Sequence, residues 1–393
     1  MGSGGRIARL PAAPNAQAAN VTLPERMSQK AKPGPATSKK VVREKSAPLL
    51  RKAVLRRLPQ RLSATAQYRV PPAPSLLEHY VQLFNDVWLG VGRVFSEDDL
   101  EQFRVALRAN LQEAWSASPY SRVLVSFETD APPKTSLSWR INVEPLTIAD
   151  EYEHWVKTRT PPLFGKHPDA KIFDLARSLG APAEVPILDI GAGTGRNTLP
   201  LARAGYPTDA VELAPALAAL LREDAAKEGL PVRVLEANLF EPSLGVEPGQ
   251  YRVLLLAEVV ASHFRTLGEL RGLFQIAAKL LPTGGLLVFS AFLNRDGYEP
   301  DDVVRQMSQV SWCKLFTRRE LQEALAGTPF QSVSDESVPA FEKVNLPAEE
   351  WPPTGWFETW SAGQDLFDLP IDKPPMDLRW LVFRKDEPGN GNG

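Results

Sequence analysis

The sequence contains a single cysteine, Cys313, among its 393 residues. One thiol cannot form an internal disulfide, a redox pair of the CxxC type or a metal site built from several thiolates. A chain without disulfides is typical of a reducing compartment, so we expect an intracellular, cytoplasmic location. The remaining composition, 43% hydrophobic and 23% charged, is that of an ordinary globular protein of about two domains.

Long hydrophobic runs are also missing from the chain. The longest, around Val253–Ala261, is interrupted by Glu258 and falls short of the ~20 residues that a membrane-spanning helix needs. The N-terminus has no apolar core of a secretory signal, so we expect neither secretion nor a transmembrane segment. Its arginine-rich, acid-poor start leaves an organelle transit peptide as the alternative.

Acidic residues are scarce in the first 75 positions, which hold 15 lysines and arginines but only Glu25 and Glu44. The formal charge is therefore +13 there and −15 over the rest of the chain. A stretch so basic and so poor in aromatic residues buries too little apolar area to fold by itself. We predict that residues 1–75 form a disordered basic tail.

One part of this tail has a helical pattern. Leu50, Val54 and Leu58 recur every four residues among arginines and a lysine, up to Pro59, which predicts a short basic amphipathic helix. This helix would contact nucleic acid, an anionic membrane or another protein. The alternative is a solvated tail that only improves solubility. We expect nucleic acid to meet the chain, if at all, only through this tail.

Residues 76–147 are predicted to form a small α+β unit. Ser96 and Asp99 have the spacing of a helix capping box, and apolar residues then recur at helical spacing up to Trp115. Two alternating segments, 123–127 and 137–143, predict a pair of strands. Because no catalytic constellation is present, we interpret this unit as an accessory cap or an oligomer contact.

From about residue 180, short apolar strands alternate with helical segments. This alternation is typical of an α/β fold with a doubly wound, mostly parallel sheet covered on both faces. Seven strands are expected, at 185–190, 208–212, 232–235, 252–257, 286–291, 331–337 and 378–384. Helices are expected at 197–204, 215–228 and 267–281.

A glycine-rich loop follows the first of these strands. It has the spacing GxGxG, at Gly191, Gly193 and Gly195, and Asp189 stands two residues before it. Dinucleotide-binding enzymes instead need GxGxxG, because a helix start must face a pyrophosphate, and Arg196 occupies that third position. A carboxylate at residue 189 disfavours a phosphate ligand and suits a cationic one.

Two further polar residues follow the next strands. Glu212 ends the second strand, 17 residues after Gly195, and Asn238 follows the third. With the loop and the Gly284-Gly285 turn, they resemble the cofactor site of class I S-adenosyl-L-methionine (SAM)-dependent methyltransferases. The resemblance implies that SAM is the cofactor, that Glu212 accepts hydrogen bonds from both ribose hydroxyls, and that Asn238 meets the adenine. The loop would supply the remaining contacts, from Asp189, Gly191, Gly193 and Gly195.

The run from residue 195 to 212, beginning Gly-Arg-Asn, is similar to the GRNS-type loop and following helix of the tellurite-resistance methyltransferase family. Thr158-Arg159-Thr160 also looks like that family's TRTHSE segment, with Pro161-Pro162 in place of His-Ser. The resemblance covers residues 150–335 and implies that Asn197 and Arg159 help to bind SAM. Tyr152 and Trp155, just upstream, either line the site or pack an entry helix on the sheet.

Glu258 and His263 are the candidate catalytic residues, because they are the ionisable side chains after the fourth strand, where an acceptor would be bound. His263 would act as a base or contact the acceptor, or would only shape the rim. Base-amino and cytosine-C5 methyltransferases carry Pro-Pro or Pro-Cys motifs that are missing here, and no acidic cluster suggests a catalytic metal. We therefore expect a small-molecule acceptor, either a metabolite, a thiol or a chalcogen oxyanion, the last two by resemblance only.

The last unusual feature is an insert at residues 338–377, with six aromatic residues and seven prolines. It is either an acceptor-binding flap or an arm folded on the small unit or a neighbouring subunit. We interpret residues 148–386, with this insert, as a methyltransferase domain that moves a methyl group by in-line displacement. The alternatives are a protein methyltransferase and a catalytically silent SAM-binding module with a nucleic-acid or partner-binding tail.

Overall fold

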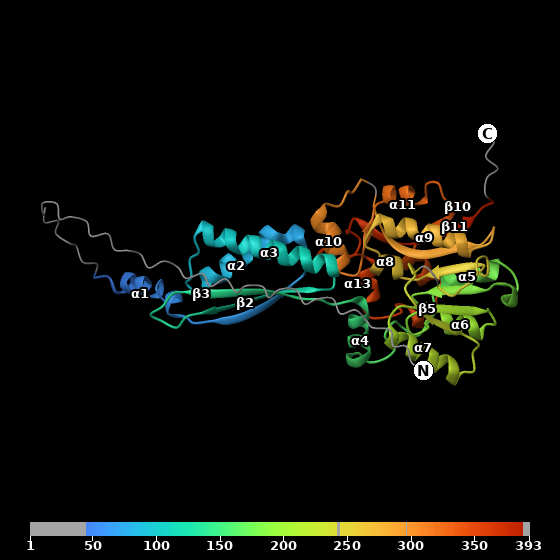
Figure 1. Ribbon diagram of the computed structural model, residues 1–393, viewed down its shortest axis with the longest axis horizontal. Coiled ribbons are helices and arrows are strands. Elements are labelled where there is room, and N and C mark those ends of the chain that lie inside the picture. Colours follow the sequence, from blue (N-terminus) through green and yellow to red (C-terminus); the bar gives the residue numbers. More distant parts are fainter. Residues whose placement is uncertain (1–44, 242–243, 296, 388–393) are drawn as a thin grey trace, which may run out of the picture. The chain divides into compact units, whose positions relative to one another are not determined.

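The computed structural model describes residues 45–241, 244–295 and 297–387 (Figure 1). The chain divides into two compact units, Met1–Pro145 and Leu146–Gly393. Residues 1–44, most of the predicted disordered tail, lie outside the described residues. None of the described helices is long and apolar enough to cross a membrane.

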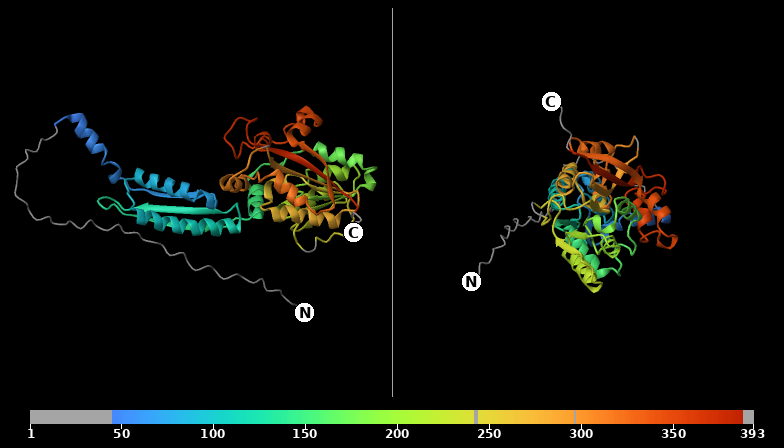
Figure 2. Two further views of the ribbon diagram at one scale, coloured as in Figure 1. Left: turned by 90° about the horizontal axis from the view of Figure 1, so that it is seen from above. Right: turned by 90° about the vertical axis from the view of Figure 1, so that its right-hand side faces the viewer.

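The first unit is a three-stranded antiparallel sheet with two helices on one face (Figure 1). Its strands, in spatial order, are β1 (Thr65–Val70), β2 (Arg122–Thr129) and β3 (Leu137–Glu144). The helices α2 (Leu77–Gly90) and α3 (Glu97–Ala117) run side by side (Figure 2).

The predicted capping box starts α3. Asp99 N–H donates to Ser96 Oγ, while the Asp99 carboxylate accepts from Ser96 N–H at 3.0 Å. The apolar face that follows includes Phe103, Leu107 and Leu111, all fully buried against the sheet. The predicted helix and strand pair of this unit are therefore confirmed.

The predicted boundary at residue 76 is wrong, because Thr65–Val70 is an edge strand of this sheet. This strand was not predicted, because it lies in the basic, aromatic-poor first 75 residues. Tyr68 packs its ring against Phe84 at 5.5 Å and Phe127 at 6.3 Å, so apolar contacts from distant residues order a strand that looks tail-like by composition. Upstream, the predicted basic helix is confirmed as α1 (Ala47–Leu55), followed by a short 3₁₀ turn at Pro59–Arg61.

The second unit contains the predicted doubly wound sheet. Its main strands lie in the order β10-β11-β8-β7-β4-β5-β6, and the short β9 (Leu315–Phe316) pairs with β8. The pairs among β8, β7, β4, β5 and β6 are parallel, whereas β11 runs antiparallel to both β8 and β10. Their bounds are β4 (Ile187–Ile190), β5 (Thr208–Glu212), β6 (Arg233–Glu236), β7 (Val253–Leu256), β8 (Leu286–Asn294), β10 (Phe330–Ser337) and β11 (Met376–Lys385). All seven predicted strands are confirmed.

Alternate residues of the central strands face two separate apolar clusters. Leu188 and Leu254 point to the layer formed by α9 (Leu267–Leu280) and α11 (Arg318–Leu325). Ile187 and Leu255 point to the opposite layer, which contains α5 (Ala170–Ser178) and the insert. A strand alternates its side chains between faces, so runs apolar at every position, such as Val253–Leu256, must be buried on both sides.

The remaining helices connect the strands or border the sheet. Those at the edge near the glycine loop are α4 (Ile148–Thr158), α6 (Thr198–Arg203), α7 (Pro215–Lys227) and α8 (Val259–His263). The others are α10 (Asp302–Val310), α12 (Val338–Asn345) and α13 (Phe357–Ser361), with 3₁₀ turns at Pro74–Leu76, Pro182–Glu184 and Ala348–Glu350.

The aromatic insert packs on the sheet of its own unit. Phe357 and Trp360 of α13 are 2% and 4% exposed, and the Trp360 ring meets Phe292 of β8 at 5.0 Å. The indole Nε1–H of Trp360 donates to the carbonyl oxygen of Trp312 at 2.9 Å. These two rings therefore belong to the core of the second unit. The expected acceptor-binding flap stays a proposal for the half-buried aromatic residues of the insert, such as Trp356.

Candidate functional site

The glycine loop leaves β4 in a conformation that requires glycine. Gly191 and Gly195 have φ of 72° and 90°, in the left-handed region. A Cβ atom on Gly191 would lie 2.3 Å from Val259 Cγ2, and one on Gly195 would lie 2.4 Å from Leu221 Cδ1. The GxGxG spacing thus places the loop tightly between the start of α8 and helix α7.

Glu212 joins the loop to the end of the second strand. Its Oε2 accepts a hydrogen bond from Gly193 N–H at 2.8 Å, and its Oε1 accepts one from Ala214 N–H at 2.7 Å. The side chain is 5% exposed, and this burial raises its pKa. Each carboxylate oxygen has a second acceptor position, so the same group can still accept from a vicinal diol.

Asp189 lies beneath the loop. Its carboxylate accepts a hydrogen bond from Thr198 Oγ1 at 2.6 Å, at the first residue of α6. Burial raises the pKa of Asp189 to about 6, against the lowering effect of that hydrogen bond. Asp189 therefore holds β4 to α6, and its predicted contact with the cofactor stays a prediction.

The other three residues predicted to bind the cofactor have protein partners. Asn197 is buried, accepting from Asp169 N–H at 2.9 Å and donating to its carboxylate at 3.0 Å. Asn238 is exposed, and its Oδ1 accepts from Phe240 N–H at 2.9 Å. Arg159 is exposed at the end of α4, with its guanidinium 3.4 Å from the centre of the Trp155 ring. Each role in binding SAM stays a prediction.

Arg196 is the functional candidate that sequence reasoning passed over. Its guanidinium bridges two carboxylates, Asp169 at 2.5 Å and Glu258 at 2.8 Å, and only 8% of its side chain is exposed. The single signal in the sequence was an arginine where a dinucleotide loop has its third glycine. Asp169 lies 27 residues before Arg196 and belongs to no recognisable motif.

Glu258, a predicted catalytic residue, is held by this bridge. It caps α8 in a left-handed conformation with φ of 62°, and its N–H donates to Ser290 Oγ at 2.7 Å. Burial raises the pKa of Glu258 to about 6, while Arg196 acts to lower it. Arg196 contacts only Oε1 of Glu258, so the predicted catalytic role of this carboxylate stays a prediction.

His263, the other predicted catalytic residue, ends α8 and pairs with Tyr152 of α4. The distance between His263 Nε2 and Tyr152 Oη is 2.8 Å. Burial lowers the pKa of His263 to about 3, so its imidazole is neutral at physiological pH. Neutral imidazole has one nitrogen that can accept a proton, but so low a pKa makes it a weak base, and the catalytic role of His263 stays a prediction.

Aromatic rings surround this pair. Trp312 lies 5.4 Å from the His263 ring and 5.2 Å from the Trp155 ring, measured between centroids, and stacks on the latter. The Phe164 ring lies 5.8 Å from the Tyr152 ring, measured between centroids. A Cβ atom on Gly193 would lie 3.3 Å from the Phe164 ring. We call Tyr152, Trp155, Phe164, His263 and Trp312 the aromatic cluster; it adjoins the glycine loop. Helix α4, which carries Tyr152 and Trp155, packs on α7, and whether these two rings also line the site stays a prediction.

Glu342 of the insert holds the start of α5. It accepts from Ala170 N–H at 2.6 Å, from Lys171 N–H at 3.2 Å and from Trp380 Nε1–H at 2.9 Å. Burial raises the pKa of Glu342 to about 7, with Asp169 as the next contribution. Helix α12 thus anchors the start of α5, where Asp169 meets Asn197 and Arg196.

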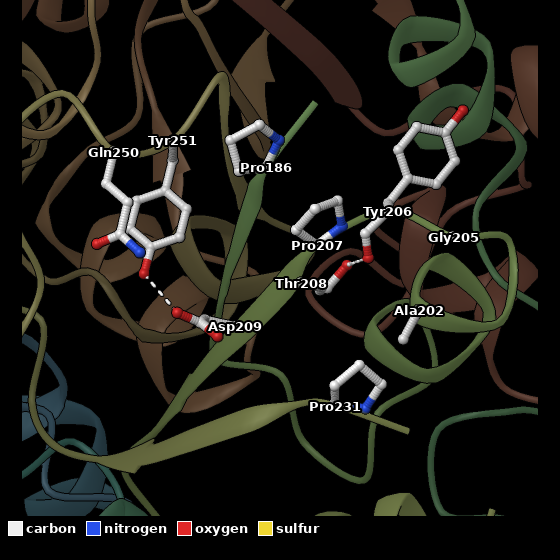
Figure 3. Close-up of a pocket in the computed structure, with 10 residues that line it drawn as sticks. All are labelled: Pro186, Ala202, Gly205, Tyr206, Pro207, Thr208, Asp209, Pro231, Gln250 and Tyr251. Atoms are coloured by element: carbon white, nitrogen blue, oxygen red, sulfur yellow. Dashed lines mark hydrogen bonds between the residues drawn. The ribbon is translucent and has the colours of Figure 1, made fainter. Parts of the chain in front are cut away.

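A hollow of about 330 Å³ lies at the opposite edge of the sheet, where β4 and β5 begin (Figure 3). Proline side chains line much of it, and its carboxylate, Asp209, accepts from Tyr251 Oη at 2.7 Å and pairs with Arg233. Within the described part of the chain, no three His, Cys, Asp or Glu side chains are placed to hold a metal.

Comparison with known proteins is consistent with a site at the glycine loop. Residues 187–285 match the family described as a methyltransferase domain. A ubiquinone biosynthesis O-methyltransferase of Caulobacter vibrioides is 34% identical over 124 residues, which make up 31% of this chain and 47% of that protein. The corresponding protein of another Caulobacter is 36% identical over 109 residues, 28% of this chain and 41% of its own length. The chain thus spans less than half the length of these curated relatives.

A solved structure, geranyl diphosphate C-methyltransferase from Streptomyces coelicolor, is 19% identical with a TM-score of 0.43, covering 55% of this chain and 78% of that one. That similarity is too distant to carry its ligands over. Residues 187–285, which include the glycine loop and Glu212, therefore resemble a methyltransferase domain.

Proposed function

We propose that this protein is a SAM-dependent methyltransferase acting on a small-molecule acceptor. The observation that carries the proposal is the Glu212 carboxylate, which ends β5 beside the glycine loop and accepts from Gly193 N–H. SAM bears a ribose diol, a cationic sulfonium and no phosphate. Its ribose hydroxyls would donate to Glu212, and the loop backbone would approach its amino acid portion at Gly191 and Gly193.

Cofactor binding can be measured with S-adenosylhomocysteine by calorimetric titration. We expect Glu212→Gln to weaken binding at least tenfold, because one acceptor oxygen is replaced by a donor group; a charge-assisted hydrogen bond contributes ~1.5–3 kcal/mol. The matched control is Glu236→Gln, at the exposed end of the neighbouring β6, which should leave the affinity unchanged. Equal affinity in the wild type and Glu212→Gln would contradict this site.

For the acceptor we propose a hydroxyl group on a ring-bearing metabolite. The names of the curated relatives suggest an oxygen acceptor, and the aromatic cluster offers ring faces beside the loop. His263 would take the hydroxyl proton as the acceptor oxygen bonds to the methyl carbon, and the electron pair of the broken C–S bond stays on sulfur. Tyr152 Oη, 2.8 Å from His263 Nε2, would orient the imidazole.

The resemblance to tellurite-resistance enzymes suggests a thiol or chalcogen oxyanion instead. An anionic acceptor needs no base, whereas a neutral hydroxyl does. We therefore expect His263→Ala to lower kcat for hydroxyl acceptors ~100-fold or more while leaving S-adenosylhomocysteine binding intact. Tyr152→Phe should lower kcat less, because it removes only the group that orients the imidazole.

A panel of phenols, thiols and selenite separates these possibilities in one assay. If only thiols or selenite are methylated and His263→Ala retains full activity, the hydroxyl acceptor and the base are both wrong. Binding of S-adenosylhomocysteine without transfer to any acceptor class would favour the silent SAM-binding module. Transfer only to a polypeptide would favour the protein methyltransferase.

A further inference from the structure

The helix α1 exposes a set of large apolar side chains. No residue of α1 is buried, and the apolar core of the first unit contains no side chain from it. Val54 is 70% exposed and Leu50 is 46% exposed, and Leu58, just beyond the helix, is 53% exposed. Several exposed apolar side chains on one ordered helix indicate a surface that binds a partner.

Three of the exposed apolar residues form a stripe, whereas Leu49 and Leu55, 51% and 54% exposed, lie outside it. Leu50, Val54 and Leu58 are four residues apart, and Leu58 continues the helical course, donating from its N–H to Leu55 O at 3.1 Å. Residues four apart lie on the same face of a helix. Arg51 and Arg57 fall on the two flanks of this stripe at 100° per residue, where long side chains can reach past an apolar surface to charged groups.

The surrounding charge has one sign. Residues 45–64 contain six cations and no acid: Lys45, Arg51, Lys52, Arg56, Arg57 and Arg61. Each cation near an anionic lipid surface adds to the attraction between the two. A partner that matches this segment therefore has a negatively charged surface and an apolar region that can take up the stripe.

We propose that α1 and the turn after it dock on an anionic lipid surface, with the stripe Leu50, Val54 and Leu58 inserted below the headgroups. Nucleic acid would satisfy the cations but leave the stripe in water. A partner helix would need a longer seam, because α1 has only 9 residues. The helix lies on the surface and does not span it, since amphipathic basic helices with a narrow apolar face bind in the interface plane.

Vesicle co-sedimentation of the full chain tests this proposal. Vesicles of phosphatidylcholine mixed equally with phosphatidylglycerol should bind the protein, and vesicles of phosphatidylcholine alone should bind it much less. The variant Leu50→Ser/Val54→Ser keeps every charge and should bind anionic vesicles about tenfold or more weaker, because two apolar side chains no longer leave water. Leu89→Ser, at an exposed position of α2, is the matched control and should bind as the wild type does.

A second pair of variants separates lipid from nucleic acid. Arg51→Gln/Arg57→Gln should weaken binding to anionic vesicles, whereas Arg108→Gln, exposed on α3, should not. A DNA duplex titrated at the same ionic strength should show no difference between the wild type and Leu50→Ser/Val54→Ser. If the serine variant binds anionic vesicles as tightly as the wild type does, the attraction is charge alone and the proposal is wrong. A loss of DNA binding in the serine variant equal to its loss of vesicle binding would also overturn it.

Discussion

Arg196 illustrates how much depends on single residues in this site. Its guanidinium is the cation between Asp169 and Glu258, two carboxylates that belong to different segments and are largely buried. A buried charge without its partner is strongly unfavourable, so this arginine compensates both acids at once. Arg196 also holds the side chain of Glu258, the N-cap residue of α8, and His263 is the last residue of that helix.

We expect Arg196→Met to lower the free energy of unfolding by ~3–5 kcal/mol near neutral pH. The loss should be smaller at about pH 5 than at about pH 8. The pKa of Glu258 is already raised to about 6, so its ionisation opposes folding as pH rises, and without Arg196 this pKa would rise further. Protonation at low pH removes the uncompensated charge.

Urea denaturation of the wild type and the variant at the two pH values measures this difference. Arg203→Met is the matched control, because Arg203 pairs with Glu228 at the surface and should contribute little. An equal loss at both pH values would show that the bridge does not act through the charges of Asp169 and Glu258.

Among the elements, the insert behaves as structural support. Helix α13 places Phe357 and Trp360 in the core, and α12 places Glu342 at the start of α5. Through Asp169 and its bonds to Asn197, this support reaches the residue next to Arg196. The insert therefore contributes to the glycine loop through α5, whether or not it also contacts the acceptor.

We expect Trp360→Ala to lower the free energy of unfolding by ~3–5 kcal/mol, because it removes a large side chain from the core. Trp356→Ala, at a half-buried position of the same insert, should cost clearly less. Thermal or urea unfolding of the two variants gives the comparison. If Trp356→Ala instead raises the KM of the acceptor while remaining stable, that part of the insert is an acceptor-binding flap.

Across the whole molecule, the N-terminal part of the chain is basic and the remainder is acidic. The first 75 residues carry a net charge of +13, and the remainder carries −15. The sheet of the second unit bears the glycine loop, while the exposed basic helix belongs to the first unit. Cofactor binding and lipid docking therefore depend on different residues, and the variants proposed for one should leave the other unchanged.

Local pattern alone determined much of this protein. All seven main strands and the helices α6, α7 and α9 follow from short-range apolar periodicity, since strand burial and helix faces repeat every two or about four residues. The GxGxG loop was also predictable, because positive φ at Gly191 and Gly195 favours glycine. Glu212 was predicted from its resemblance to the methyltransferase cofactor site, at the end of the strand beside β4.

Only the tertiary structure decided the contacts between distant segments. Arg196 meets Glu258 across 62 residues, and Glu342 meets Ala170 across 172, with no periodic signal in between. The same holds for Thr65–Val70, whose place at the edge of the first sheet depends on pairing with β2. Buried charges and edge strands are stabilised by partners that the chain brings together only on folding, so their local sequence does not reveal them.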